Sequence, residues 1–165
     1  MEKHSVEMIA RALNDHQVKY LIAGGLAVVA HGYVRFTADI DLILAMDRQN
    51  LLAAVAALTA LNYRPRAPVA FELFADPESR KQWIEEITVF SLSSPDHPAT
   101  EIDLFVDPPL TFTEAYSRAL QLEIAPGIVA AFCSIDDLIE LKSLAGRPQD
   151  LMDIAKLRKL RENCP

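Results

Sequence analysis

Two short segments carry the most informative pattern of hydrophobic and polar residues in this chain. Residues 39–44 read Asp-Ile-Asp-Leu-Ile-Leu, and residues 101–107 read Glu-Ile-Asp-Leu-Phe-Val-Asp. Short apolar runs of this kind predict buried strands. Because side chains two positions apart on a strand point to the same face, Asp39 and Asp41 lie side by side, as do Glu101 and Asp103. Each strand therefore carries carboxylates at the edge of a hydrophobic core.

The remaining pattern predicts a mixture of helices and strands. Helical periodicity and capping residues indicate helices over residues 2–15, 26–31, 47–61, 76–83, 111–120, 134–145 and 149–161. Apolar runs indicate further strands over residues 20–23, 71–74, 87–92, 121–124 and 128–132. Strands and helices alternate, but not strictly, and a turn joins two of the strands. This favours a mixed sheet flanked by helices, α/β or α+β, with C-terminal helices.

The length and composition are those of a single globular domain. We expect residues 1–165 to form one domain, since 51% of them are hydrophobic and 24% are charged. The net charge of −7 argues against non-specific binding of nucleic acid, which depends on neutralising phosphates. The basic residues of the tail are expected to form a solvated helical face; they are Lys156, Arg158, Lys159 and Arg161.

The sequence also predicts a cytoplasmic protein without a membrane segment. Its longest apolar stretch, residues 51–61, is too short to span a bilayer. Its amino terminus precedes an amphipathic helix rather than the apolar region of a signal peptide. Cys133 and Cys164 are therefore expected to be reduced thiols, and their spacing is not that of a zinc site.

The paired carboxylates point to a divalent cation. Unpaired, Asp39 and Asp41 would repel each other and resist burial. Oxygen ligands of this kind suit Mg²⁺. If the second acidic strand lies beside the first, Asp103 completes a group of three carboxylates. The alternative is that such acids are solvated or cap the next helix. The second acidic strand and the upstream glycine pair favour the metal site.

Thirteen residues separate the pair Gly24-Gly25 from Asp39, and the pair lies at the predicted turn from a strand into a helix. The start of a helix offers free backbone N–H groups and partial positive charge, which suit a phosphate. Glycine allows the phosphate to approach the backbone closely. Together, a phosphate-binding turn and a metal-binding group are what phosphoryl or nucleotidyl transfer requires.

The stretch from Gly24-Gly25 to Asp39-Ile40-Asp41 resembles the motif of the DNA polymerase beta-type nucleotidyltransferase superfamily. Residues 23–41 are similar to its small bacterial members, the minimal nucleotidyltransferases and abortive-infection toxin-type enzymes. Arg35 and Thr37 occupy positions before the acids where the family often has these residues. Residues 141–154 resemble a second segment that the small bacterial members share. One departure is Leu26, where the family often has a serine at or just after the second glycine.

The resemblance implies a chemistry and a set of residues. Asp39, Asp41 and Asp103 would be the catalytic residues and would hold two Mg²⁺ ions. A nucleoside triphosphate would bind to Gly24, Gly25, Arg35, Thr37 and Lys142. A hydroxyl acceptor would attack the α-phosphorus and release pyrophosphate, with Asp103 nearest the acceptor. The acceptor is left open between an RNA end, a protein and a small molecule such as an aminoglycoside.

Two other functions remain open from the sequence. A catalytically silent, nucleotide-binding member would act as a regulatory or toxin–antitoxin partner, and the short chain favours a protein partner or a homodimer. A Mg²⁺-dependent nuclease or phosphohydrolase would use the same acids. Among the polar residues, Arg147, Asp150 and Asp153 could pair across helix ends, and His31 and Trp83 are expected to be structural.

Overall fold

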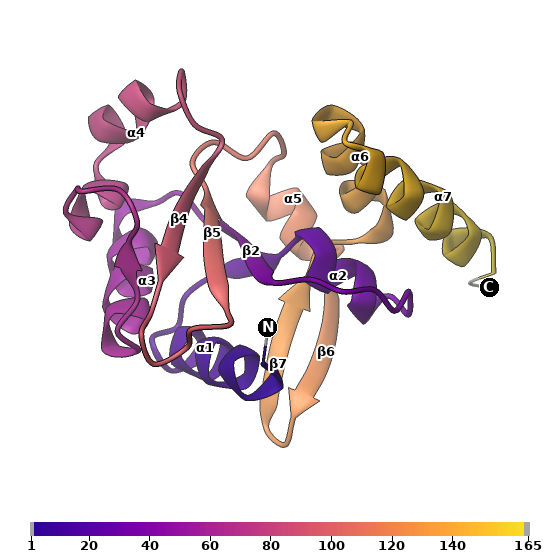
Figure 1. Ribbon diagram of the computed structural model, residues 1–165, viewed down its shortest axis with the longest axis horizontal. Helices are drawn as coiled ribbons and strands as arrows, with labels where there is room; N and C mark the ends of the chain where they lie inside the picture. The colour runs from indigo at the N-terminus through magenta and orange to yellow at the C-terminus, as the bar shows by residue number, and fades with distance from the viewer. Residues whose placement is uncertain (1, 164–165) are drawn as a thin grey trace.

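A single mixed sheet of seven strands organises the protein (Figure 1). The computed structural model describes residues 2–163. The strands are β1 (Tyr20–Ile22), β2 (Asp39–Leu44), β3 (Arg64–Pro65), β4 (Val89–Ser93), β5 (Glu101–Phe105), β6 (Leu120–Ala125) and β7 (Ile128–Phe132). The helices are α1 (Lys3–Asp15), α2 (Gly24–Ala30), α3 (Arg48–Ala60), α4 (Pro77–Trp83), α5 (Phe112–Ser117), α6 (Ile135–Ala145) and α7 (Pro148–Asn163), with a 3₁₀ helix, η1 (Phe71–Ala75).

The strand order places the two acidic strands next to each other. The order is β3-β4-β5-β2-β1-β7-β6. Strands β2 and β5 are parallel neighbours, as are β1 and β7, and the other pairs are antiparallel. In the β2–β5 register, Asp41 stands opposite Asp103 and Asp39 stands opposite Glu101. The mixed α/β fold predicted from the sequence is confirmed.

The alternation within β2 separates the core from the carboxylates. Ile40 and Leu42 are almost fully buried on one face, whereas Asp39 and Asp41 are half-buried on the other. Helices α1 and α3 pack against each other, and α2 contacts β2. The first residue of α2, Gly24, lies against the side chain of Asp41, so this helix begins on the carboxylate face.

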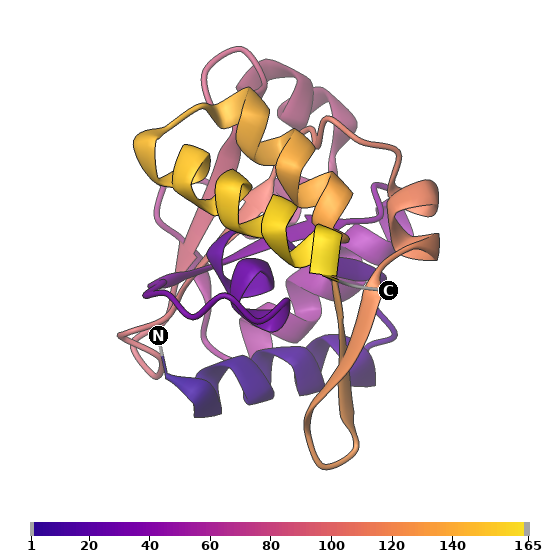
Figure 2. The ribbon, with the colours of Figure 1, turned by 90° about the vertical axis from the view of Figure 1, so that its right-hand side faces the viewer.

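The C-terminal helices α6 and α7 form an antiparallel pair beside the sheet (Figures 1 and 2). The chain reaches them from β7, and α6 also contacts α2. The β6–β7 hairpin extends away from the body of the molecule, with its turn at the bottom of both views. The arrangement brings residues from the last quarter of the chain to the glycine turn near its beginning.

Two predicted elements differ most clearly from the structure. Residues 71–74 form the 3₁₀ helix η1 rather than a strand, because Phe71 and Phe74 are both buried and both pack on Phe90. Their spacing of three residues matches one turn of such a helix. The predicted helix over residues 111–120 is shorter, ending at Ser117 in α5, because Leu120 already pairs with Phe132 in the sheet.

Cys133 is a free, fully buried thiol, and burial raises its pKa to about 12, so it stays protonated. Cys164 lies outside the described residues. Trp83 stacks on Phe90 with ring centroids 5.1 Å apart, as its structural interpretation expects. Within residues 2–163, no helix combines the length and apolar character needed to cross a membrane.

Asn50 joins helix α3 to two strands of the sheet. Its side chain accepts a hydrogen bond from the Lys19 N–H at 2.7 Å and donates to the Lys19 and Ala45 carbonyl oxygens at 3.0 and 2.9 Å. These backbone groups lie just before β1 and just after β2. The side chain of Asp47 caps α3 by accepting from the Asn50 N–H, as predicted. Asn50 therefore fixes the ends of the two strands that carry the glycine turn and the first two carboxylates.

We predict that Asn50→Ala lowers the free energy of unfolding by about 2–4 kcal/mol, because the three side-chain hydrogen bonds of Asn50 to the backbone are lost. Urea unfolding would measure the change. Gln49→Ala, at the exposed neighbouring position of the same helix, is the control. Equal stability of the two variants would contradict this role of Asn50.

Candidate functional site

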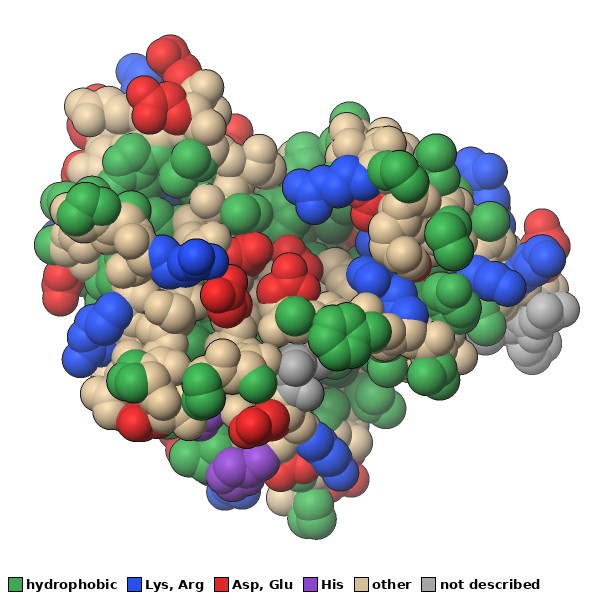
Figure 3. Space-filling view, in the orientation of Figure 1, with side chains coloured by type: hydrophobic (Ala, Val, Ile, Leu, Met, Phe, Trp, Pro, Cys, Tyr) green, Lys and Arg blue, Asp and Glu red, His purple; other side chains and the backbone are tan. Residues whose placement is uncertain are grey.

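The three predicted carboxylates meet at one point. Asp39, Asp41 and Asp103 each offer a carboxylate oxygen, and these oxygens lie within 4.8 Å of one another. All three side chains are half-buried. Figure 3 shows acidic side chains gathered near the middle of this face, with basic side chains on either side. The geometry follows from β2 and β5 being neighbours in a register that sets Asp41 opposite Asp103.

Asp41 is the member of this group whose pKa shifts clearly from its ordinary value. Burial, followed by the neighbouring Asp39 and Asp103 carboxylates, raises the pKa of Asp41 from 3.8 to about 7. Lys142 and Arg147 act in the opposite direction and lower the pKa. Three carboxylates this close disfavour the fully ionised state unless positive charge is brought to them.

Two hydroxyl groups hold the outer carboxylates. Thr37 Oγ1 donates to Asp39 Oδ1 at 3.1 Å, from the loop before β2. Ser91 Oγ donates to Asp103 Oδ1 at 2.6 Å, from the adjacent strand β4. The second contact is short, as is usual when the acceptor is ionised. Each of these carboxylates therefore has one oxygen engaged by the protein and another available.

The two glycines are required by the side chains around them. Gly24 has a φ of +58°, and a Cβ atom there would lie 1.7 Å from Asp41 Oδ2. A Cβ atom on Gly25 would lie 2.5 Å from Arg35 Nη2 and 2.7 Å from Thr37 Oγ1. Any side chain at either position would therefore displace residues of the site. The glycine turn, the loop and the carboxylates form one closely packed unit.

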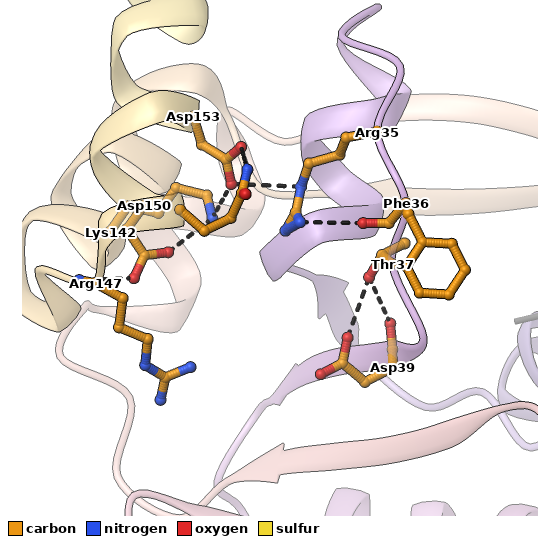
Figure 4. A network of polar contacts seen from close by, with 9 residues as sticks. Arg35, Phe36, Thr37, Asp39, Lys142, Arg147, Asp150 and Asp153 are labelled. Carbon is orange, nitrogen blue, oxygen red and sulfur yellow. Dashed lines mark hydrogen bonds and ion pairs between the residues drawn. The ribbon is translucent and has the colours of Figure 1, made fainter.

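A buried ionic network joins this unit to the C-terminal helices (Figure 4). Asp153, on α7, is fully buried, and its Oδ2 lies 2.7 Å from Lys142 Nζ and 3.4 Å from Arg35 Nε. Lys142 also contacts Asp150 Oδ1 at 3.2 Å. Arg35 Nη1 donates to the Phe36 carbonyl oxygen. Two cations and two carboxylates thus compensate each other beside Gly25.

The predicted phosphate-binding residues lie in two different environments. Gly24, Gly25 and Thr37 lie against the carboxylates, whereas Lys142 is 7% exposed in its side chain and is held by Asp150 and Asp153. The sequence left open whether Asp150 and Asp153 form ion pairs across the helix ends. In the structure, both carboxylates contact Lys142. Arg147 is exposed, and in Figure 4 its guanidinium points away from Lys142 and Asp150.

Two further residues have roles that the sequence left open or did not indicate. His31 Nε2 lies 2.8 Å from the Cys133 carbonyl oxygen, so its contact is structural, as expected. Ser91 was not singled out by any sequence pattern. The alternation of buried Phe90 and Leu92 around it is the signal that places it on the carboxylate face. Its contact with Asp103 depends on the register of β4 against β5.

The donor set suits a hard divalent cation. Three carboxylates offer only oxygen ligands, and a cation would relieve the repulsion that raises the pKa of Asp41. Asp39 and Asp103 each keep an oxygen free of their hydroxyl partners. The three residues therefore form a group that can hold a metal ion.

Residues 4–162 match the family described as "Nucleotidyltransferase of unknown function (DUF6036)". The chain belongs to this nucleotidyltransferase family. The predicted membership of the nucleotidyltransferases is thereby confirmed, while the resemblance to small toxin-type members stays a prediction. A search of curated protein sequences finds no match to this chain.

Solved structures of nucleotidyltransferases share the fold. A crystal structure of ANT(2")-Ia in complex with adenylyl-2"-tobramycin is 16% identical, with a TM-score of 0.59, over 97% of this chain and 94% of that chain. A solution structure of ANT(2'')-Ia has a TM-score of 0.58 at 16% identity, over 97% and 89%. An antigenic nucleotidyltransferase-like protein from Paracoccidioides brasiliensis has a TM-score of 0.61 at 18% identity, over 96% and 75%.

We predict that Asp41→Asn stabilises this nucleotidyltransferase when it is free of metal. Asp41 has an ordinary pKa of 3.8 and a folded pKa of about 7, so the folded state binds more protons between these values. The free energy of unfolding therefore falls as the pH rises from about 4 to 7. At pH 8 in a chelator, the substitution should add about 1–3 kcal/mol to the free energy of unfolding, and less at pH 5.

Urea unfolding at both pH values measures this gain, with Asp15→Asn, at an exposed position, as the control. A smaller gain at pH 8 than at pH 5 would contradict the assignment.

We predict that Asp153→Asn lowers the free energy of unfolding by about 2–4 kcal/mol, because it leaves the buried Lys142 and the partly buried Arg35 with less negative charge beside them. Asp136→Asn breaks an ion pair with Arg161 in which both side chains are more than half exposed, and it should change stability little. Thermal and urea unfolding would compare the two variants. A loss as small for Asp153 as for Asp136 would show that the buried network is not needed for stability.

Proposed function

We propose that this protein is a Mg²⁺-dependent enzyme that transfers a nucleoside monophosphate from a nucleoside triphosphate to a hydroxyl acceptor, releasing pyrophosphate. The observation that carries the proposal is the convergence of Asp39, Asp41 and Asp103 beside the Gly24-Gly25 turn. Membership of a nucleotidyltransferase family and the shared fold support it.

Asp39, Asp41 and Asp103 would hold two Mg²⁺ ions. When bound, the ions supply positive charge that offsets the charge of the triphosphate and favours ionisation of the acceptor hydroxyl. Thr37 and Ser91 keep the Asp39 and Asp103 carboxylates in place through their hydrogen bonds. The group is then ready to receive charge without rearrangement, which is a general requirement for electrostatic catalysis.

The reaction needs one bond to form and one to break. The acceptor oxygen bonds to the α-phosphorus, and the bond from that phosphorus to the oxygen of pyrophosphate breaks. The acceptor proton passes to Asp103, which lies on β5 opposite Asp41 of β2. The pyrophosphate portion lies toward the N–H groups at the start of α2, where Gly24 and Gly25 leave the backbone uncovered.

Arg35 and Lys142 would contribute positive charge to the phosphate side. Arg35 lies directly over Gly25, so its guanidinium is close to any phosphate that reaches the turn. Lys142 acts from α6, where it already lowers the pKa of Asp41 across the site. Asp153 contacts both cations. The phosphate groups of a bound triphosphate would therefore interact with Arg35 and Lys142 while these remain paired with this carboxylate.

The acceptor class is best explored first with small hydroxyl compounds. The structure of ANT(2")-Ia, which holds adenylyl-2"-tobramycin, spans nearly the same extent of fold as this chain. Aminoglycosides are therefore the first acceptors to test, followed by RNA ends and protein hydroxyls. A toxin–antitoxin role and a protein partner or homodimer remain alternatives. We also propose that the protein acts in the cytoplasm.

We predict that the protein, with Mg²⁺ and a triphosphate labelled at the α-phosphate, moves the label onto an acceptor and releases unlabelled pyrophosphate. Asp41→Asn and Asp103→Asn should lower the transfer rate at least 100-fold, because each removes a ligand charge, and Asp15→Asn should not. Chromatography of the labelled products measures transfer. Binding of triphosphate without transfer would favour the silent, regulatory alternative, and release of monophosphate would favour a phosphohydrolase. Absence of triphosphate binding at millimolar Mg²⁺ would overturn the proposal.

A further inference from the structure

Strand β4 supplies a side chain to the carboxylate group that neither the family motif nor the sequence pattern assigns. In the antiparallel register of β4 and β5, Ser91 stands directly opposite Asp103. Phe90 and Leu92, on either side of Ser91, are buried in the core, so Ser91 faces the same side of the sheet as the carboxylate. Its hydroxyl donates to Asp103 Oδ1 at 2.6 Å.

We propose that Ser91 is a positioning residue that fixes the Asp103 carboxylate as a metal ligand, an inference that rests on the proposed function. A carboxylate on a short side chain can rotate about its last bond and present either oxygen. The hydrogen bond from Ser91 engages one oxygen and leaves the other for the cation. Asp103 is the ligand that most needs this, since it comes from a different strand than Asp39 and Asp41.

The other two carboxylates are each held by a different local feature. Thr37 Oγ1 donates to Asp39 Oδ1 in the same way, at 3.1 Å. Asp41 Oδ2 packs against the α-carbon region of Gly24, where a Cβ atom would overlap it. Each ligand of the group is therefore restrained by one neighbour, and for Asp103 that neighbour is Ser91. Such outer contacts commonly change metal affinity 10- to 100-fold when they are removed.

A purely structural role for the Ser91–Asp103 pair makes a different prediction. Cross-strand pairs also stabilise sheets, and losing this one would then lower the melting temperature without changing metal affinity. The matched variants Ser91→Thr and Ser91→Val separate the two roles, because both are β-branched and of similar size but only threonine keeps a hydroxyl. Ser93→Ala is the control on the same strand, at an exposed position.

The experiment measures binding of Mn²⁺, as a spectroscopic probe for the site, to the full chain by electron paramagnetic resonance and titration calorimetry. We expect Ser91→Val and Ser91→Ala to bind Mn²⁺ about 10-fold or more weakly, and Ser91→Thr and Ser93→Ala to bind within about twofold of the unaltered protein. Thermal unfolding in a chelator reports the stability of each variant separately.

The outcomes distinguish the inference from the proposed function. Equal affinity of the Thr and Val variants, with the unaltered protein binding Mn²⁺, overturns the role of Ser91 and leaves the metal site intact. Lack of Mn²⁺ binding by the unaltered protein overturns the metal site itself and the inference with it. Weaker binding by Val than by Thr, at similar melting temperatures, supports the positioning role.

Discussion

Repulsion among three carboxylates is the constraint on which the rest of this site depends. The fold sets Asp39, Asp41 and Asp103 with oxygens within 4.8 Å, a distance at which negative charges strongly disfavour one another in a partly buried setting. The buried cation Lys142 is already matched by Asp150 and Asp153. Negative charge at the cluster is therefore left without an equal counter-charge among the described residues. A group of carboxylates arranged in this way can hold a divalent cation.

The structure reveals a second role for the glycine pair. The sequence interpretation gave Gly24 and Gly25 one role, a bare backbone for phosphate. The structure shows that Gly24 also makes room for Asp41, and Gly25 makes room for Arg35 and Thr37. The spacing of the motif thus reflects packing among its own members. Arg35, Thr37 and Asp41 occupy space that a side chain on one of the glycines would otherwise fill.

The sequence predicted the parts of the site that depend on local pattern, and not those that depend on which strands are neighbours. Alternation along residues 39–44 and 101–107 placed the acids on common faces, and both strands are found. It could not show that β4 would flank β5 in a register that brings Ser91 to Asp103. Residues 71–74 were misassigned because a short run of aromatic residues fits a strand or a helical turn equally well. Packing of Phe71 and Phe74 on Phe90, which is distant in sequence, favours the helical turn.

Ion pairs of Asp153 connect the C-terminal helices to the loop before β2. Asp153 is fully buried, and burial of a carboxylate is costly unless cations accompany it. Its partners are Lys142, one helix away, and Arg35, more than a hundred residues earlier in the chain. Arg35 in turn lies over Gly25 and precedes Thr37, which holds Asp39. A continuous set of polar contacts therefore runs from α7 to the loop before β2, so the position of the helix pair and the geometry of the carboxylates are physically linked.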